Sequence, residues 1–320
     1  MILDRKMKEN FMIRFTQFAL LICLLSAAPS KAALVLSLDA REPGPDPTNS
    51  WQDLSGTNSP FTANSNFDGT GGLGDVNAGS APMLVNDPNS VGAFYDFNNA
   101  ADTTGPAFFA SSVGDNDNFD FDTAKGTSTD PFTVVVYGKA QGGSTDGVIN
   151  KGRNSTNGVW FVDIQNNNNA ELVQQPNNGG ARNFGRWNGL TSSDEDFHLY
   201  VFHADGSGDA SNSRLYYDGA TADSNAAHPI NGLGESILND TELHIGAMEN
   251  FGNVNDFDGA IQFIEIYTGS TVDNQFVSGM SPSDYSAWRS ANLSAIIPEP
   301  TSLVLLGIGL IGLLGSTRRR

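Results

Sequence analysis

The segment Ala260-Ile261-Gln262-Phe263-Ile264-Glu265-Ile266-Tyr267 has apolar side chains on both faces of a strand. Successive side chains of an extended backbone point to opposite faces, so Ile261 and Phe263 face one way and Ile264 and Ile266 the other. A strand that is apolar on both faces belongs inside a layered structure rather than on an open sheet. The segment therefore predicts an all-β fold in which two antiparallel sheets pack as a sandwich.

Strand-like segments recur along the chain before this one, separated by turns rich in Gly, Asn and Asp. Leu34, Leu36 and Leu38 recur at every second position, as in a half-buried strand. Other expected strands lie at 91–97, 132–137, 159–164, 198–203, 214–217 and 243–245. We interpret the polar segments 58–79 and 165–180 as long loops. Because no linker or internal repeat divides the region, we expect one sandwich domain.

Two local signals add a turn and a helix to these strands. Asp218-Gly219 follows a strand-like segment and predicts a tight hairpin turn. Ser281 is a suitable cap and Pro282 a suitable first residue for a short helix. In that helix Tyr285 and Trp288 share one face.

The composition excludes some classes of protein. The chain has 320 residues, of which 17 are Lys or Arg and 36 are Asp or Glu, and its formal net charge is −19. With 39% hydrophobic and 17% charged residues it is not a disordered polyelectrolyte. Phosphate binding needs a basic face, so we expect no nucleic-acid partner.

Residues 1–32 have the pattern of a secretory signal. Basic residues precede an apolar run over 15–25, and small residues follow it. This order predicts a signal peptide over 1–32 that is cleaved after Ala32, with Met1, Met7 or Met12 as the true start. The single cysteine, Cys23, lies inside this segment, so the exported chain would contain no disulfide.

The last residues combine three features in order, namely Pro298-Glu299-Pro300, an apolar run over 301–317, and Arg318-Arg319-Arg320. At about 1.5 Å per residue, such a helix reaches roughly 25 Å, just short of a bilayer core. The order resembles the PEP-CTERM sorting signal of Gram-negative bacteria, whose members an exosortase processes near the tripeptide. The resemblance implies export, transient anchoring in the membrane through the C-terminal helix, and release to the cell surface or an exopolysaccharide matrix.

These two ends hide the charge of the part between them. Without 1–32 and 298–320, nine basic and 33 acidic side chains remain in 33–297, a net charge of −24. Such a domain suits divalent cations and is poorly suited to an anionic polysaccharide unless a cation bridges the two.

Several short motifs occur in a fixed order along 33–297, and their order can be compared with that of known domains. The series opens with Leu36-Ser37-Leu38-Asp39-Ala40 and Trp51-Gln52-Asp53-Leu54-Ser55-Gly56. It continues with 132–136, 147–152, 198–202, 215–219, 243–246 and 257–261. The series resembles the LamG-like jelly-roll domains of the concanavalin A-like lectin and glucanase superfamily. The resemblance implies a jelly-roll sandwich over 33–297.

The glucanase branch of that superfamily carries its carboxylates as Glu-x-Asp-x-x-Glu on one strand. No such triplet occurs here, and Glu265, the acid best placed on a strand, has no second acid two residues later. The Gly-x-Ser-x-Gly elbow of serine hydrolases is also absent from the sequence. We therefore expect no enzymatic activity and assign no catalytic residue.

Two clusters that mix Asp with Asn are candidate calcium sites, because Ca²⁺ takes carboxylate and carbonyl oxygens as ligands. The first cluster contains Asp115, Asp117, Asp120 and Asp122, and the second contains Asp256 and Asp258. Neither has the spacing of an EF-hand loop, so solvated acidic turns are the alternative interpretation.

Trp187 is the candidate platform for a carbohydrate, because the face of an aromatic ring stacks on the C–H face of a sugar. It lies in the polar segment 183–189, which we expect to be an exposed loop. Our interpretation is an exported, non-catalytic module that binds exopolysaccharide or a surface protein. The alternatives are a polysaccharide-acting enzyme of the same fold and a purely structural matrix protein.

Overall fold

The computed structural model describes the following residues: 33–63, 82–88, 91–97, 108–112, 118–121, 131–141, 147–151, 159–165, 168–175, 183–190, 196–204, 213–221, 224–228, 242–250, 253–268 and 281–296. The chain divides into two units, Met1–Lys31 and Ala32–Arg320, and every described residue belongs to the second. The predicted signal peptide with its cleavage site at Ala32, and the sorting segment 298–320, lie outside the described residues. Within the described part, no helix has the length and apolar character needed to cross a membrane.

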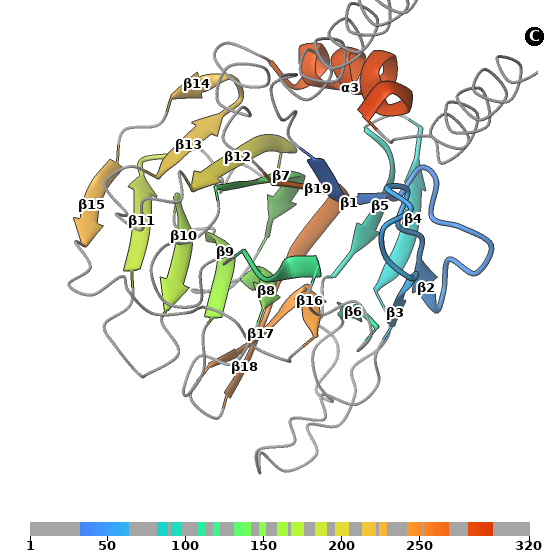
Figure 1. Ribbon diagram of the computed structural model, residues 1–320, viewed down its shortest axis with the longest axis horizontal. Helices are drawn as coiled ribbons and strands as arrows, with labels where there is room; N and C mark the ends of the chain where they lie inside the picture. Colours follow the sequence, from blue (N-terminus) through green and yellow to red (C-terminus); the bar gives the residue numbers. More distant parts are fainter. Residues whose placement is uncertain are drawn as a thin grey trace, which may run out of the picture. The chain divides into compact units, whose positions relative to one another are not determined.

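Antiparallel strands form two large sheets (Figure 1). The first sheet contains β1 (Ala33–Asp39), β4 (Met83–Asp87), β5 (Gly92–Asp96), β7 (Phe132–Ala140), β12 (His198–Ala204), β13 (Arg214–Tyr217), β14 (Ala220–Thr221) and β19 (Gly259–Thr268). The second contains β2 (Ser50–Trp51), β3 (Phe61–Ala63), β6 (Phe109–Ala110), β8 (Gly147–Lys151), β9 (Val159–Gln165), β10 (Asn169–Gln175), β11 (Asn183–Asn188), β15 (Ser224–His228) and β16 (Leu243–Ile245). A separate ribbon joins β17 (Ala247–Asn250) to β18 (Asn253–Asp256).

The segment that predicted the sandwich is the central strand of the first sheet. One edge of β19 pairs with β7, and its other edge pairs first with β5 and then with β1. All of its residues except the last are buried. The expectation that Ile261 and Phe263 share a face is wrong, because the register shifts between them and turns Phe263 to the opposite side.

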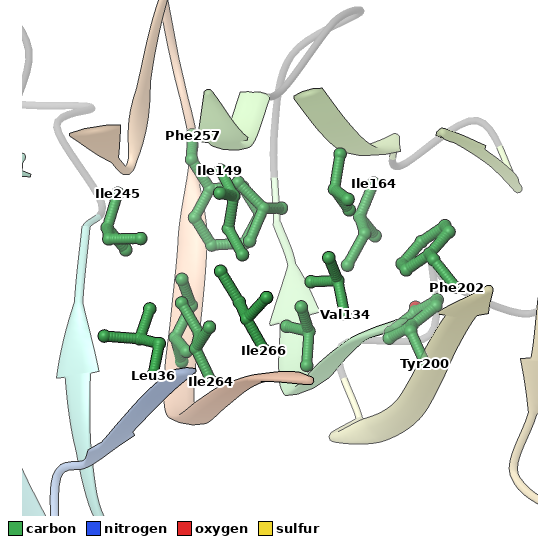
Figure 2. Close-up of a cluster of buried hydrophobic side chains, with 14 of the residues drawn as sticks. Leu36, Val134, Ile149, Ile164, Tyr200, Phe202, Ile245, Phe257, Ile264 and Ile266 are labelled. Carbon is green, nitrogen blue, oxygen red and sulfur yellow. The ribbon is translucent and has the colours of Figure 1, made fainter. Parts of the chain in front are cut away.

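The main core lies between the two sheets (Figure 2). Side chains from the first sheet meet side chains from the second sheet and from the loop before β19. Those labelled in Figure 2 are Leu36, Val134, Tyr200, Phe202, Ile264 and Ile266 on one side and Ile149, Ile164, Ile245 and Phe257 on the other. The all-β sandwich expected from the sequence is confirmed.

A third layer covers part of the outer face of the first sheet, which faces away from the second sheet (Figure 1). It is the helix α3 (Pro282–Ile296), which starts where the sequence predicted. The hydroxyl of Ser281 accepts a hydrogen bond from the backbone N–H of Asp284, and the Asp284 carboxylate accepts one from the backbone N–H of Ser281. Tyr285 and Trp288 pack on Phe263 and other outward residues of the sheet.

One turn matches the sequence prediction, and the two predicted loops do not. Asp218 and Gly219 both have positive φ, 48° and 84°, as in the tight hairpin turn predicted there. The interpretation of 58–79 as a loop is wrong at Phe61–Ala63, which form β3 and pair with β2 and β6. The interpretation of 165–180 as a loop is wrong, because β10 lies inside it and pairs with β9 in a hairpin that includes Asn168 at φ 68°. The surrounding Asn and Gln residues hid the inward alternation of Ala170 and Leu172.

Candidate functional site

The uncovered part of the outer face of the first sheet is hollowed into a groove. Two cavities, of about 410 and 450 Å³, adjoin at Val91 and Tyr137, which line both. The first is also lined by Asp87, Phe94, Lys139, Asp196, Phe197, His198 and Asp218. The second extends along the start of α3 and is also lined by Arg41, Gln262, Phe263, Pro282, Ser283 and Ser286. We call the two together the outer-face groove.

Aromatic rings form a continuous strip in this groove. The ring centroids of Phe94 and Phe197 are 5.3 Å apart, and those of Phe197 and Tyr137 are 5.6 Å apart. Tyr137 stacks on the buried ring of Phe263 at 5.4 Å. Phe94, Tyr137 and Phe197 are half-buried, so each keeps part of its ring in solvent. We call these three residues the ring strip.

The strands place the strip residues by simple alternation. Val134 and Val136 of β7 point into the core, so Tyr137 and Lys139 point outward. Lys139 Nζ lies 5.6 Å from the centre of the Phe197 ring, a cation–π distance.

Three aspartates and two cations, Lys139 and Arg41, line the groove. Asp218 lies in the β13–β14 turn, and its carboxylate bonds His198 Nδ1 at 2.7 Å and accepts the backbone N–H of Leu199 at 2.9 Å. Burial raises the pKa of Tyr137, and the charges of Asp218 and Asp196 raise it further, while Arg41 opposes them.

The part of the outer face beneath α3 carries a different kind of site. Glu265 of β19 is fully buried and pairs with Arg289 of α3, whose guanidinium also bonds Asp39 of β1 at 2.5 Å. Tyr267 and Tyr285 both donate hydrogen bonds to Glu265. We call these five residues the buried charge network.

Electrostatics inside this network favour the charged forms of Asp39 and Arg289. Burial alone would raise the pKa of Asp39, but hydrogen bonding to Arg41 and the charges of Arg289 and Arg41 lower it overall. Burial likewise opposes the charge on Arg289, yet the two carboxylates raise its pKa. Sequence reasoning identified Glu265 as the best-placed acid but gave no sign of Arg289 as its partner.

A second carboxylate pair was also missed. Glu171 of β10 lies directly opposite Asp163 of β9, and both are buried on the outer face of the second sheet. Arg186 pairs with Glu171, and Gln165 donates a hydrogen bond to Asp163 at 2.9 Å. The glucanase pattern places its acids along one strand, whereas these two come from neighbouring strands of a hairpin.

The proposed calcium ligands are only partly described. Asp115, Asp117 and Asp122 lie outside the described residues, and the same holds for the side chain of Asp256. Asp120 forms an ion pair with the buried Lys151 at 3.2 Å. Burial and the nearby Asp96 raise the pKa of Asp258. Among the side chains described, no three of His, Cys, Asp or Glu lie close enough to hold a metal ion. Calcium binding stays a prediction.

The expectation that Trp187 lies in an exposed loop is wrong. It belongs to β11, is 1% exposed, and packs edge-on against Phe202 at 6.0 Å. Gly185 lies beside its ring, where a Cβ atom would be only 2.7 Å away. The polar neighbours point outward, as Arg186 does, and so disguised a strand whose other face is buried. A ring in this position has no free face for a sugar, so its role is packing.

Comparison with solved structures finds β-sandwich domains at low identity. One is domain 4 of AbnA, a GH43 extracellular arabinanase from Geobacillus stearothermophilus, in complex with arabinotriose, with 14% identity over 81% of this chain and 98% of that one and a TM-score of 0.46. Another is the Ruminococcus gnavus IT-sialidase CBM40 bound to α2,3-sialyllactose, with 10% identity over 59% and 90% and a TM-score of 0.36. A third is the binding domain of Botulinum neurotoxin DC in complex with SialylT, with 11% identity over 81% and 51% and a TM-score of 0.43.

At these TM-scores the likenesses carry no argument about a ligand. No curated protein matches the sequence. One family model does match, at the end of the chain that the three sequence features singled out. Residues 297–320 carry the PEP-CTERM protein-sorting motif, which implies that the protein is exported to the cell surface or beyond.

Proposed function

We propose that the protein is an exported, non-catalytic carbohydrate-binding module whose ligand lies in the outer-face groove. The observation that carries the proposal is the ring strip, three linked and half-buried rings in an open groove. Such rings stack on the C–H faces of sugars, and polar groups beside them bond the hydroxyls. Lys139 and Asp196 supply a donor and an acceptor at the same place.

The polar groups of the first sheet support a role in binding rather than catalysis. Glu265 is held by Arg289 and two tyrosines beneath α3, so it is not exposed to a substrate. Asp218 is fixed by His198 and by the backbone of β12. These are contacts that position strands and turns.

The finer account of the ends of the chain belongs to the same proposal. An exosortase-type enzyme processes the chain near Pro298, after transient anchoring through 301–317, and the mature protein reaches the cell surface or an exopolysaccharide matrix. The PEP-CTERM motif supports this route. The antiparallel sandwich, with the LamG-like segments in order along it, supports a jelly-roll module of that type.

One specific observation favours a second candidate, a polysaccharide-acting enzyme. Asp163 and Glu171 are directly opposite each other on neighbouring strands. Directly opposed residues have Cβ atoms about 4.5–5.5 Å apart, and retaining glycosidases hold two carboxyl groups roughly 5 Å apart. Their burial and the Arg186 pair favour a structural role instead.

The test is retention on polysaccharides, measured by co-sedimentation of the full-length chain in mild detergent. Phe94→Ala removes a ring of the strip and should weaken retention about tenfold. Met83→Ala is the matched control, because Met83 is 62% exposed on the neighbouring strand and does not line the groove. Retention that Phe94→Ala leaves unchanged would contradict the proposal.

A reducing-sugar assay on the same polysaccharides tests the second candidate. Release that Glu171→Gln abolishes would establish the enzyme and overturn the non-catalytic assignment. A chain that neither binds nor releases any sugar would support the purely structural alternative.

A further inference from the structure

We propose that the outer-face groove selects cationic amino sugars, so that its ligand is a polysaccharide with free amino groups, such as a glucosamine polymer. This inference rests on the proposed function and names the ligand class of the same groove. It is carried by the sign and the placement of the charges around the ring strip.

The carboxylates reach the groove from three directions. Asp87 ends β4, Asp196 precedes β12, and Asp218 lies in the β13–β14 turn. Lys139 is the one lysine or arginine among the described residues that line the first cavity, and with His198 neutral that cavity carries a net charge of −2. Arg41 in the second cavity brings the whole groove to −1. The ring strip therefore lies beneath a rim that is negative overall.

The hydroxyl of Tyr137 in the groove lies within reach of these charges. After burial, the charges of Asp218 and Asp196 are what raise its pKa, with Arg41 opposing them. The same field that disfavours a phenolate there favours an ammonium group. Aromatic ring faces attract cations as well, so the strip and the rim act in the same direction.

The chemistry of the ligand follows from this arrangement. A sugar that stacks on the strip uses its C–H face, and its substituents project from the edge of the ring toward the rim. The rim carboxylates attract an ammonium group at that edge, whereas they repel the carboxylate of a uronic acid. N-acetylation keeps the stacking face and removes the charge. The mature domain, with nine basic and 33 acidic side chains, extends the same preference to long range.

The test is a binding series on the full-length chain in mild detergent at low ionic strength. The probes are oligomers of glucosamine, N-acetylglucosamine, glucose and a uronic acid, each titrated by calorimetry. We expect glucosamine oligomers to bind about tenfold more tightly than the N-acetylated ones, and we expect the ratio to shrink as salt screens the charges.

Two variants with opposite effects sharpen the test. Asp87→Asn combined with Asp196→Asn should bring the ratio close to one, because it removes two of the three carboxylates that line the first cavity. Lys139→Gln should increase the ratio, because it removes the positive charge from the first cavity. Glu242→Gln is the charge-matched control: Glu242 precedes a strand of the second sheet, and its removal should leave the ratio unchanged.

The outcomes separate this inference from the proposed function. If neutral or N-acetylated oligomers bind as well as glucosamine and Phe94→Ala weakens that binding, the charge selection is wrong and the carbohydrate module stands. If the uronic acid binds best, the charge selection is likewise overturned. If no oligomer binds, both proposals are wrong.

Discussion

The covered and the open parts of the outer face of the first sheet both combine carboxylates with aromatic rings, but they differ in what surrounds the charges. Beneath α3, Glu265 has a guanidinium and two tyrosine hydroxyls as partners and no access to water. In the groove, Asp218 has one histidine and one backbone partner and keeps about a third of its side chain in solvent. Buried charges tolerate the loss of a partner poorly, because water cannot replace it. The comparison therefore separates a carboxylate that is fully enclosed by the fold from one that remains in contact with solvent.

The substitution with the largest expected effect on stability is Arg289→Met, in the covered part of the outer face. It leaves Glu265 and Asp39 buried without their shared cation, which should lower the free energy of unfolding by about 3–5 kcal/mol. Denaturant titration followed by tryptophan fluorescence measures the change. Arg186→Met is the matched control, since its side chain is 40% exposed beside Glu171, and it should cost no more than about 1 kcal/mol. Equal losses of unfolding free energy in the two variants would show that the buried ion pair is no more important for stability than the partly exposed one.

Acid unfolding gives a second measure of the covered part. The pKa of Asp39 is lower in the folded protein than its ordinary value of 3.8, so its contribution to stability is present above pH 3.8 and is lost as the pH falls below it. Charged hydrogen bonds of this kind contribute about 1–3 kcal/mol. In Asp39→Asn the melting temperature should fall less between pH 5 and pH 2 than in the wild type. Parallel curves for the two proteins would show that Asp39 is not the titrating group.

Substitutions in the outer-face groove should change ligand binding more than they change the free energy of unfolding. Phe94→Ala should weaken carbohydrate binding about tenfold, roughly 1.4 kcal/mol, because a stacking surface is lost. Calorimetric titration with the oligomer that binds best measures this, with Met83→Ala as the control. If the variant bound the oligomer normally but unfolded far more easily, Phe94 would stabilise the fold rather than bind the ligand.

The smallest expected effect is that of Asp87→Asn on stability. Asp87 lies at the rim of the groove and is only half-buried, so the free energy of unfolding should change by no more than about 0.5 kcal/mol. Denaturant titration at neutral pH, run beside Asp39→Asn, gives the contrast directly. A cost at Asp87 as large as that at Asp39 would mean that the rim also holds the fold.

Elements defined by local sequence were predictable. The buried strand 260–267, the Asp218-Gly219 turn and the cap at Ser281 each contain their whole signal within a few residues, and all three are confirmed. Only the faces within the strand differ, because the register shift puts Ile261 and Phe263 on opposite sides. The Trp-x-Asp-x-Ser-Gly segment is explained by the structure. Trp51 packs in the core against Tyr95, and Asp53 accepts the backbone N–H groups of residues 37, 55 and 58, which fixes the turn against β1.

The candidate site was not predictable, because its parts meet only through sheet register. Phe94, Tyr137 and Phe197 belong to three distant segments, and nothing near any of them in sequence indicates that the rings of Phe94 and Tyr137 each lie within 6 Å of the Phe197 ring. Arg289 and Glu265 are joined by the docking of α3, which no local pattern specifies. The prediction that Trp187 is exposed was wrong for the opposite reason. Its polar neighbours suggested exposure, although alternation along β11 turns the ring inward.

The double attachment of Arg289 also determines how the domain would carry a mechanical load. A pull on the chain beyond Ile296, where the sorting motif follows, would peel α3 from its C-terminal end toward Arg289. There the force divides between β1, the first described strand, and β19, the central strand of the first sheet. A tether at the end of the chain would therefore load the middle of the sandwich through one guanidinium rather than strip an edge strand. The Arg289 side chain would thus resist the detachment of α3 when the C-terminal end of the chain is pulled.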